Sequence, residues 1–245
     1  MGHQMQAQDS RTQATTAENI QWFADNDKYI ESQSRLEHYQ HVKRIVEREL
    51  TGVGRLLDIG NGGFFNYDTR LAAHVTAVDL FLKDGPGPFP NSAFRQGSLL
   101  ELPFLDGSFD CILLQNVFHH VTGRTVQQNH RNLDAGLRQI HRCLAPGGKI
   151  VIIESTVGRL FYQIERALFT TALAIKRGGH PVTFQFTPQQ IVQSAEGAGL
   201  VVEELTFVPT GTYVLQMGYK WPSVLTPVKP IKLILRRHAV TGAQA

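Results

Sequence analysis

A carboxylate that follows a glycine-bearing turn by about 20 residues could bind the ribose of a nucleoside in this chain. The branched apolar residues before Asp58 suit a buried parallel strand, and the glycines within Gly60–Gly63 allow a tight turn that a ligand can approach closely. A second apolar run, Val75–Asp79, ends in the carboxylate of Asp79. A carboxylate at this place in a doubly wound fold accepts hydrogen bonds from both ribose hydroxyls.

Two other nucleotide-binding patterns do not fit this turn. The dinucleotide fingerprint G-x-G-x-x-G needs a third glycine at position 65, where the chain has Phe65. The turn is not followed by a G-K-[ST] phosphate loop. The sequence therefore disfavours nicotinamide dinucleotides and nucleoside triphosphates as ligands.

Two adjacent histidines, His119 and His120, could act as general bases. They follow the apolar run 109–115, which predicts a strand, at the sheet edge where open α/β proteins bind ligands. A neutral imidazole can take the proton of a hydroxyl group while that oxygen forms a new bond. The structural alternative is that both histidines cap the strand and position the following loop, and the sequence leaves both interpretations open.

Four ordered sequence blocks resemble the class I S-adenosylmethionine-dependent methyltransferases, in the small-molecule branch that includes the ubiquinone and menaquinone methyltransferases. The resemblance covers roughly residues 40 to 220. Its blocks are the glycine turn Arg55–Gly63 and the segments Gly97–Asp110, Gln115–Val121 and Leu144–Lys149. They occur in the family's order and at its spacing, which is far more specific than a glycine turn alone.

The resemblance implies S-adenosylmethionine as the cofactor. Asp58 and Gly60 would line its methionine part. Asp79 would take the ribose hydroxyls, and Ser98 and Leu99 would border the adenine. The complete set of expected cofactor contacts is Tyr29, Asp58, Gly60, Asn61, Gly62, Asp79, Leu80, Ser98, Leu99, Gln115 and Asn116.

The chain departs from the family's pattern at two positions. The usual D-x-G-x-G-x-G loop would place its last glycine at position 64, where this chain has Phe64 after Gly63. We therefore expect a reshaped loop. The acidic residue that often borders the adenine is replaced by Ser98, whose hydroxyl accepts the same hydrogen bond as a weaker, neutral acceptor.

Aromatic residues in two segments are predicted to cover the cofactor and form the acceptor pocket. One segment comprises residues 22–41, and the other is a lid insertion at about 158–187. The substrate-binding residues expected in the insertion are Phe161, Tyr162 and Phe184. The alternative is that the insertion forms a helix whose apolar stripe packs on the core. The residues with that helical spacing are Phe161, Ile164, Leu168 and Thr171.

Alternating strand and helix signals predict a single α/β domain with a Rossmann-like, doubly wound, seven-stranded sheet. The sheet is expected to be mostly parallel with an antiparallel last strand. Predicted strands lie at 54–59, 74–79, 92–96, 109–115, 148–154, 200–208 and 212–219. Predicted helices include Tyr39–Leu50, Leu133–Leu144 and Pro188–Ala198, and Thr187 is expected to cap the last of them.

The methyltransferase domain is expected to span residues 19–220. Residues 1–18 are polar and lack the apolar core of a signal peptide, so they are predicted to be a disordered tail. Residues 221–245 mix apolar and basic side chains, as membrane-binding tails do. Prolines at 222, 227 and 230 break any long helix there, which favours a packed or flexible tail over membrane contact.

Composition and charge fit an ordinary globular domain and disfavour several classes of function. The chain is 42% hydrophobic and 18% charged, and its net charge of +3 without an extended basic stripe does not indicate nucleic-acid binding. Cys111 and Cys143 form neither a metal-binding pattern nor a disulfide framework. A reducing compartment, the cytoplasm, is the simplest inference, and the sequence does not specify an oligomeric state.

The predicted function is methyl transfer from S-adenosylmethionine to an oxygen or nitrogen atom, and only in third place a carbon atom, of a small apolar or aromatic molecule. Two alternatives stay open: a binding module without methyl transfer, and a protein that uses the cofactor to assist a cyclisation or rearrangement. Macromolecular methylation is disfavoured, because the sequence shows neither an appended recognition domain nor an N-P-P-[YFW] block.

Overall fold

The structure of the chain is a computed structural model that describes residues 37–81, 89, 91–175, 183–208 and 227–237. Several expectations from the sequence fall outside these ranges. They concern the polar tail 1–18, the cofactor contact Tyr29 and the strand at 212–219. The expectations for the other elements are tested below.

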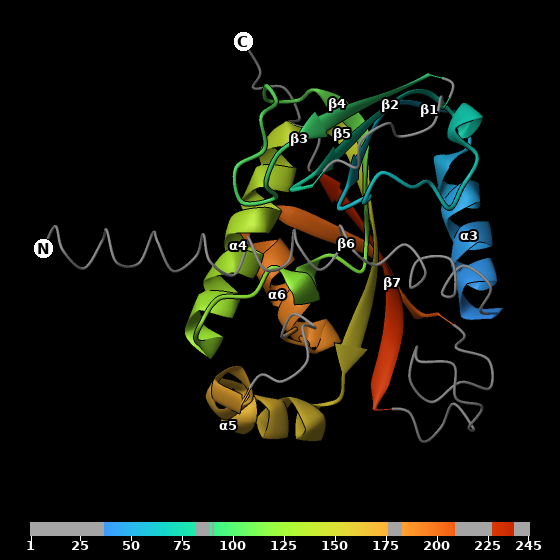
Figure 1. The fold of residues 1–245 in the computed structure, drawn as a ribbon. Helices are drawn as coiled ribbons and strands as arrows, with labels where there is room; N and C mark the ends of the chain where they lie inside the picture. Colours follow the sequence, from blue (N-terminus) through green and yellow to red (C-terminus); the bar gives the residue numbers. More distant parts are fainter. Residues whose placement is uncertain (1–36, 82–88, 90, 176–182, 209–226, 238–245) are drawn as a thin grey trace, which may run out of the picture.

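The described strands form one seven-stranded sheet. Their bounds are β1 (Val53–Ile59), β2 (Ala72–Asp79), β3 (Ser92–Gln96), β4 (Phe109–Gln115), β5 (Leu144–Val157), β6 (Leu200–Phe207) and β7 (Val228–Arg237). They lie in the order β3-β2-β1-β4-β5-β7-β6, and only β7 runs antiparallel to its neighbours β5 and β6 (Figure 1). The predicted doubly wound, mostly parallel sheet with an antiparallel last strand is confirmed.

Helices cover both faces of this sheet (Figure 1). Their bounds are α3 (Glu37–Leu50), α4 (Val126–Cys143), α5 (Arg159–Ile175) and α6 (Pro188–Gly197), with short 3-10 turns at Thr69–Leu71 and Phe118–His120. Helix α3 buries Val46 and Leu50 on one face, whereas α4 and α6 contribute to a second hydrophobic core on the other. The central strands are therefore buried on both sides, which explains their nearly continuous apolar runs.

The predicted start of α6 is confirmed, whereas the prediction for α4 missed its first two turns. Thr187 accepts a hydrogen bond from the Gln190 N–H group, and the Gln190 side chain accepts one from the Thr187 N–H group, which forms a capping box. Helix α4 begins at Val126 rather than at position 133, because Thr125 caps it. Its first turns are mostly polar, so apolar periodicity did not mark the start.

The interpretation of residues 221–245 as a tail is wrong for Val228–Arg237, because these residues form β7 inside the sheet. The side chains of Ile231, Leu233 and Leu235 are completely buried. Pro230 fits near the start of the strand because only its carbonyl is needed, which accepts a hydrogen bond from the Val208 N–H group at 2.9 Å. The prolines that exclude a helix are thus compatible with this strand.

Two basic residues of β7 pair with acids of β6. Lys232 Nζ lies 2.7 Å from Glu204 Oε2, and Arg236 Nε lies 2.7 Å from Glu203 Oε2. At these positions the mixture of apolar and basic residues is the side-chain alternation of a strand inside the sheet. Within the described ranges, no helix is long and apolar enough to cross a bilayer.

Replacing a β7 side chain tests the placement of this strand. We expect Leu233→Ala to lower the free energy of unfolding by about 2–5 kcal/mol, because it removes a fully buried side chain from the core. Leu105→Ala is the matched control, since Leu105 is 83% exposed. Its effect should stay within about 0.5 kcal/mol. Denaturant unfolding measures both, and equal small effects would contradict a packed β7.

The apolar stripe that was predicted to pack on the core lies on the outer face of α5. Phe161, Ile164 and Leu168 are 48%, 47% and 55% exposed. The buried face instead carries Tyr162 and Phe169. Consecutive helical residues are rotated by about 100°, and both faces of α5 contain apolar residues, so periodicity alone did not distinguish them.

Candidate functional site

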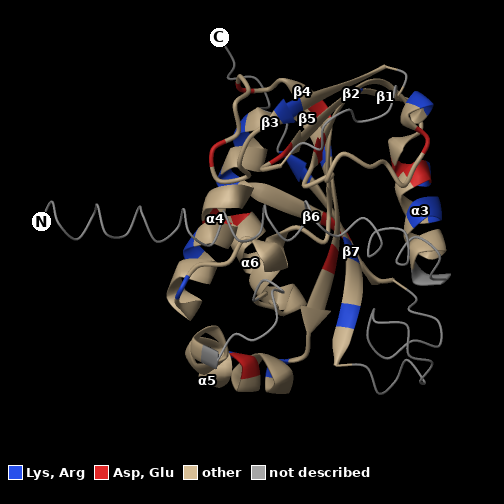
Figure 2. Cartoon of the chain, in the orientation of Figure 1, with Lys and Arg blue, Asp and Glu red and all other residues tan. Residues whose placement is uncertain are grey.

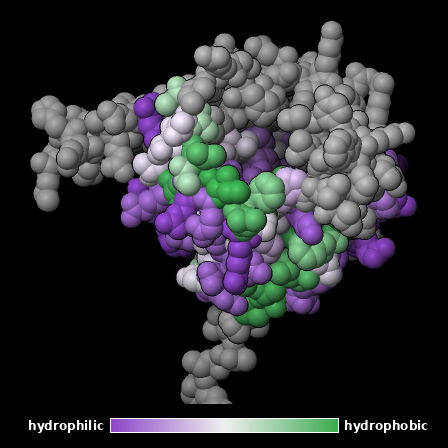
Figure 3. Space-filling view, turned by 90° about the horizontal axis from the view of Figure 1, so that it is seen from below, coloured by the Kyte–Doolittle hydropathy of each residue, from purple (hydrophilic) through white to green (hydrophobic). Residues whose placement is uncertain are grey.

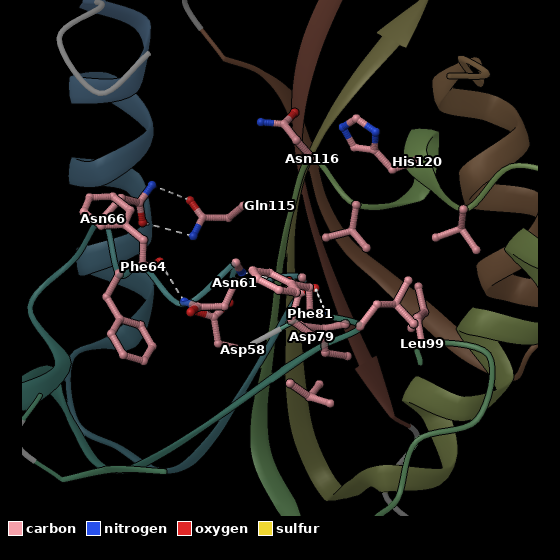
Figure 4. Close-up of a pocket in the computed structure, with 18 of the residues that line it drawn as sticks. Asp58, Asn61, Phe64, Asn66, Asp79, Phe81, Leu99, Gln115, Asn116 and His120 are labelled. Atoms are coloured by element: carbon pink, nitrogen blue, oxygen red, sulfur yellow. Dashed lines mark hydrogen bonds between the residues drawn. The ribbon is translucent and has the colours of Figure 1, made fainter. Parts of the chain in front are cut away.

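A cavity of about 760 Å³ opens at the carboxyl ends of β1, β2 and β4, where ligands of open α/β sheets bind. Every described residue that the sequence predicts for the cofactor lines this cavity (Figure 4). These residues are Asp58, Gly60, Asn61, Gly62, Asp79, Leu80, Ser98, Leu99, Gln115 and Asn116. The two candidate bases, His119 and His120, line the same cavity.

The three residues predicted to bind the substrate do not line this cavity. Phe161 is largely exposed, whereas Tyr162 and Phe184 are buried in the core with their ring centroids 5.9 Å apart. No described residue of the insertion 158–187 is part of the cavity wall. Aromatic side chains have the same sequence signature in a core and in a pocket, so the sequence did not separate the two.

Three glycines and an asparagine shape the turn after β1. The three glycines of the segment Gly60–Gly63 have φ angles of 74°, 65° and 80°, in the left-handed region that glycine adopts without strain. Asn61 Nδ2 donates to the Phe64 carbonyl at 2.8 Å and closes the turn, and the Phe64 side chain lines the cavity. A Cβ atom at Gly60 would lie 2.7 Å from a Val117 methyl carbon, so position 60 has no room for a side chain.

Asp58 is buried beneath the turn, with one carboxylate oxygen shared by two donors. Tyr67 Oη and Asn61 Nδ2 both donate to Asp58 Oδ2, each at 2.8 Å. Burial raises the pKa of the Asp58 carboxyl from 3.8 to about 7, although these two hydrogen bonds oppose the shift. The nearby Asp79 carboxylate adds a smaller increase. Both protonation states of Asp58 are therefore populated near neutral pH.

The raised pKa of Asp58 predicts a stability that depends on pH. The unfolded chain loses this proton near pH 3.8, whereas the folded protein keeps it until about pH 7. Because the folded state binds more protons in this window, its free energy of unfolding falls as the pH rises from the lower to the higher value. We expect Asp58→Asn, which resembles the protonated acid in shape, to reduce this fall.

Denaturant unfolding of the wild type and the Asp58→Asn variant at several pH values across that window measures the difference. The fall is reduced rather than abolished, because Glu165, whose pKa burial also raises to about 7, remains in the variant. An unchanged pH dependence in the variant would show that Asp58 is ionised throughout the window.

The carboxylate of Asp79 faces the same turn from the end of β2. Its Oδ2 accepts a hydrogen bond from the Gly62 N–H group at 2.7 Å, and its Oδ1 accepts one from the Phe81 N–H group at 3.2 Å. Each oxygen keeps a further lone pair for a ligand hydroxyl. Leu80, Phe81 and Leu99 add apolar lining, which suits the flat faces of a base (Figure 4).

The polar groups of the cavity fit S-adenosylmethionine. Among the described residues, Asn61 Oδ1 is buried without a hydrogen-bond partner, so this acceptor beside the turn can take a donor such as the amino group of the methionine part. Ser98 Oγ accepts from the Leu100 N–H group at 3.1 Å and keeps one lone pair for the adenine amine. Together with Asp79, these groups match the chemistry of the methionine, ribose and adenine parts.

Gln115 and Asn116 line the cavity at the end of β4, but their amides also hold the protein together. Gln115 and Asn66 exchange two hydrogen bonds of 2.8 and 3.1 Å, which tie β4 to the segment after the glycine turn (Figure 4). Asn116 has a φ angle of 57°, which is uncommon for a residue other than glycine, and its Oδ1 accepts a hydrogen bond from Ser155 Oγ. Such strained positions are typical of functional sites.

His119 is held by a buried carboxylate that sequence reasoning missed. Its Nδ1 lies 2.6 Å from Oε1 of Glu154, which is completely buried. The Phe118 N–H group donates to Glu154 Oε2 at 2.7 Å, and the Ser155 N–H group donates to Oε1 at 2.8 Å. When Glu154 is ionised, both of its oxygens are acceptors, and the tautomer of His119 that matches them carries its proton on Nδ1. In a neutral ring, Nε2 is then free of a proton.

The signal for Glu154 was present in the sequence, since it is the only carboxylate in the apolar run Lys149–Val157. A lone carboxylate in a buried strand needs a partner, because burying it unpaired is costly. Glu154 contacts the His119 ring, and the ring of His120 lies tilted against that of His119 with the centroids 4.1 Å apart. The structure therefore distinguishes two histidines that the sequence treats as equivalent.

Known proteins resemble this chain in sequence over part of its length. The family described as "Methyltransferase domain" matches residues 57–152. The demethylmenaquinone methyltransferase of Chlorobaculum parvum is 33% identical over 36% of this chain and 34% of its own length. The ubiquinone/menaquinone biosynthesis C-methyltransferase of Vibrio cholerae is 30% identical over 41% of this chain and 40% of its own length. The chain thus spans less than half the length of these two curated relatives.

A solved structure extends the likeness to most of the chain. The 1,6-didemethyltoxoflavin-N1-methyltransferase of Burkholderia thailandensis, with bound S-adenosylhomocysteine, has a TM-score of 0.61 at 16% identity. The match covers 92% of this chain and 88% of that protein, and at this identity it shows the fold. Residues 57–152 thus match a methyltransferase domain, and the chain has the fold of class I methyltransferases, which together support S-adenosylmethionine as the cofactor.

Proposed function

We propose that the protein methylates an oxygen or nitrogen atom of a small, largely apolar or aromatic molecule, with His119 as the general base. The observation that carries this proposal is the buried Glu154–His119 pair at the wall of the cavity. Methyl transfer can proceed without a general base, so the cofactor site alone does not identify the acceptor. An imidazole that a carboxylate orients beside that site suits an acceptor that must lose a proton.

The turn end of the cavity would hold the cofactor. When bound, S-adenosylmethionine supplies a methyl group on a positively charged sulfur, and the sulfur is the leaving group in an in-line displacement. Asp79 would accept hydrogen bonds from the ribose hydroxyls, and Asn61 Oδ1 would accept one from the amino group. Leu80 and Leu99 would pack on the adenine. These contacts orient the reacting methyl group, and orientation supplies much of the rate in such a displacement.

The Glu154–His119 pair would remove the acceptor proton. Nε2 of His119 would take the proton from the acceptor oxygen or nitrogen as that atom receives the methyl group. The positive imidazolium that forms is stabilised by the Glu154 carboxylate 2.6 Å away, which also fixes the ring orientation. His119 later returns the proton to solvent.

The size and lining of the cavity support a small apolar acceptor. Its volume of about 760 Å³ must hold the cofactor together with the acceptor. Phe64, Val117 and Val121 line it with apolar surface, and a few polar groups would orient the ligand. The relatives named for menaquinone and ubiquinone biosynthesis support the inclusion of aromatic hydroquinones among the acceptors to be tested.

The test is to incubate the purified protein with S-adenosylmethionine and a panel of hydrophobic phenols, hydroquinones and aromatic amines, and to weigh the products. A product heavier by one methylene group, formed together with S-adenosylhomocysteine, is the expected result. An acceptor that is converted without a change in mass would indicate a cofactor-assisted cyclisation or rearrangement instead. Cofactor binding without conversion of any acceptor on the panel would favour the binding module.

A further inference from the structure

The outer face of α5 exposes a row of large apolar side chains. Leu160, Phe161, Ile164 and Leu168 lie on this helix with 72%, 48%, 47% and 55% of their surfaces exposed. In the view from below, which is the side of the molecule where α5 lies in Figure 1, hydrophobic residues gather into patches (Figure 3). Single exposed apolar residues are ordinary on a protein surface, but a contiguous row is typical of an interaction surface.

The inner face of α5 is firmly packed, so the orientation of the helix is determined by the core. Tyr162 and Phe169 are buried, and both rings make edge-on contacts with Phe184, at centroid distances of 5.9 and 5.1 Å. The Tyr162 hydroxyl also lies 2.8 Å from Nε2 of His130 on α4. Because this face is held by specific contacts, rotating the helix to bury the outer row would expose the aromatic cluster.

The exposed charges of α5 have one sign. The helix carries both signs of charge in its sequence, with Glu165 as its only carboxylate (Figure 2). Arg159 and Arg166 are exposed, whereas Glu165 is partly buried and accepts a hydrogen bond from the Gln185 N–H group at 2.9 Å. Burial raises the pKa of the Glu165 carboxyl to about 7, so part of its negative charge is lost at neutral pH. The outer surface of α5 is therefore apolar and cationic.

We propose that the outer face of α5 binds an anionic lipid bilayer, with the helix lying in the plane of the membrane surface. Helices of this kind insert phenylalanine and leucine side chains at the level of the headgroups, while arginines pair with anionic lipids. Helix α5 follows directly from the carboxyl end of β5, at the same edge of the sheet as the cavity. This contact places that edge near the membrane, where apolar molecules accumulate.

A second copy of the chain fits this surface less well than a bilayer does. A twofold interface would pack the same row of α5 against itself and bring Arg159 and Arg166 of both copies together. Since α5 has no exposed carboxylate to pair with them, such an interface would concentrate positive charge. Anionic headgroups neutralise the same arginines.

Sedimentation of the full chain with vesicles tests this inference, which does not rest on the proposed methyl transfer. We expect binding to vesicles of phosphatidylcholine with phosphatidylglycerol, weaker binding to phosphatidylcholine alone, and a decrease with added salt. Combining Phe161→Gln with Leu168→Gln should lower the partition coefficient at least about tenfold, because both side chains would leave the headgroup region. Leu105→Gln, an exposed leucine before β4, is the matched control and should bind as the wild type does.

Three results would overturn the inference. The first is no sedimentation of the wild type with anionic vesicles, and the second is equal binding by the double variant, which would place the contact elsewhere. The third is a concentration-dependent dimer, seen by analytical ultracentrifugation and lost in the double variant, which would make the face of α5 a contact between copies. Circular dichroism confirms that each variant is folded, as expected for changes at exposed positions.

Discussion

Asp79→Ala should weaken the binding of S-adenosylhomocysteine by about 100-fold or more, because the variant loses a charged acceptor for two ribose hydroxyls. The same carboxylate accepts the Gly62 N–H group at 2.7 Å, so its removal also releases the glycine turn that borders the ligand. Asp79→Asn should fall between the wild type and alanine, since an amide accepts through one oxygen only. Isothermal titration calorimetry with S-adenosylhomocysteine measures all three proteins.

Asp106→Ala is the matched control for this measurement. Asp106 is an exposed aspartate that pairs with Arg142 and does not line the cavity, so its removal should leave the affinity unchanged. Wild-type affinity in a folded Asp79→Ala variant would mean that the ribose is held elsewhere. If the wild type itself binds neither S-adenosylmethionine nor S-adenosylhomocysteine, the proposal of methyl transfer fails.

That the residues at the turn end would line one cavity could be predicted from the sequence, because it depends on backbone conformation and on where strands end. Glycines after a buried strand and an acid at the end of the next strand leave few alternatives for where a ligand approaches. The course of the turn itself could not be predicted, because its closure depends on Asn61, whose side-chain N–H group donates to both Asp58 and the Phe64 carbonyl.

The strand β7 could not be predicted because its sequence resembles a surface segment. Two of its basic residues pair with acids of β6, Lys232 with Glu204 and Arg236 with Glu203. A linear pattern of apolar and basic residues does not reveal such partners. Pro230, which was read as a helix breaker, lies in a strand, where it needs no N–H partner.

The acceptor side of the site was predicted only in part. His119 and His120 were identified from their place after β4, but the residues expected from α5 turned out to be core or surface. The orientation of α5 is decided by contacts of Tyr162 and Phe169 with Phe184, which follows the helix in sequence. Both faces of the helix are apolar in sequence, so only tertiary packing determines which one is buried.

Glu154 favours the interpretation of His119 as a general base over its interpretation as a residue that caps the strand. A histidine that merely caps a strand needs no buried carboxylate, and burying a carboxylate is costly unless it is paired. Here three donors meet its two oxygens, which are the Phe118 and Ser155 N–H groups and His119 Nδ1. The arrangement orients the ring of His119 through Nδ1 and leaves Nε2 for proton transfer, whereas His120 lies beside that ring with the centroids 4.1 Å apart.

This difference predicts unequal effects of the two histidines on catalysis. With the best phenol found on the acceptor panel, His119→Ala should lower kcat by about 100- to 10,000-fold, the range usual for loss of a general base. Its KM for S-adenosylmethionine and its affinity for S-adenosylhomocysteine should stay close to those of the wild type, because His119 makes no contact with the turn or with Asp79 in the described structure. His120→Ala is the matched variant and should lower kcat much less.

Added imidazole distinguishes a catalytic role of His119 as a base from a purely structural role. If His119 acts as a base, imidazole added to the His119→Ala variant should restore part of the lost kcat, because it supplies the missing proton acceptor in the space of the removed ring. It should have no such effect on the wild type or on His120→Ala. A His119→Ala variant that keeps its kcat, or one that loses cofactor affinity and is not restored by imidazole, would instead assign the Glu154–His119 pair to holding β4, β5 and the following turn together.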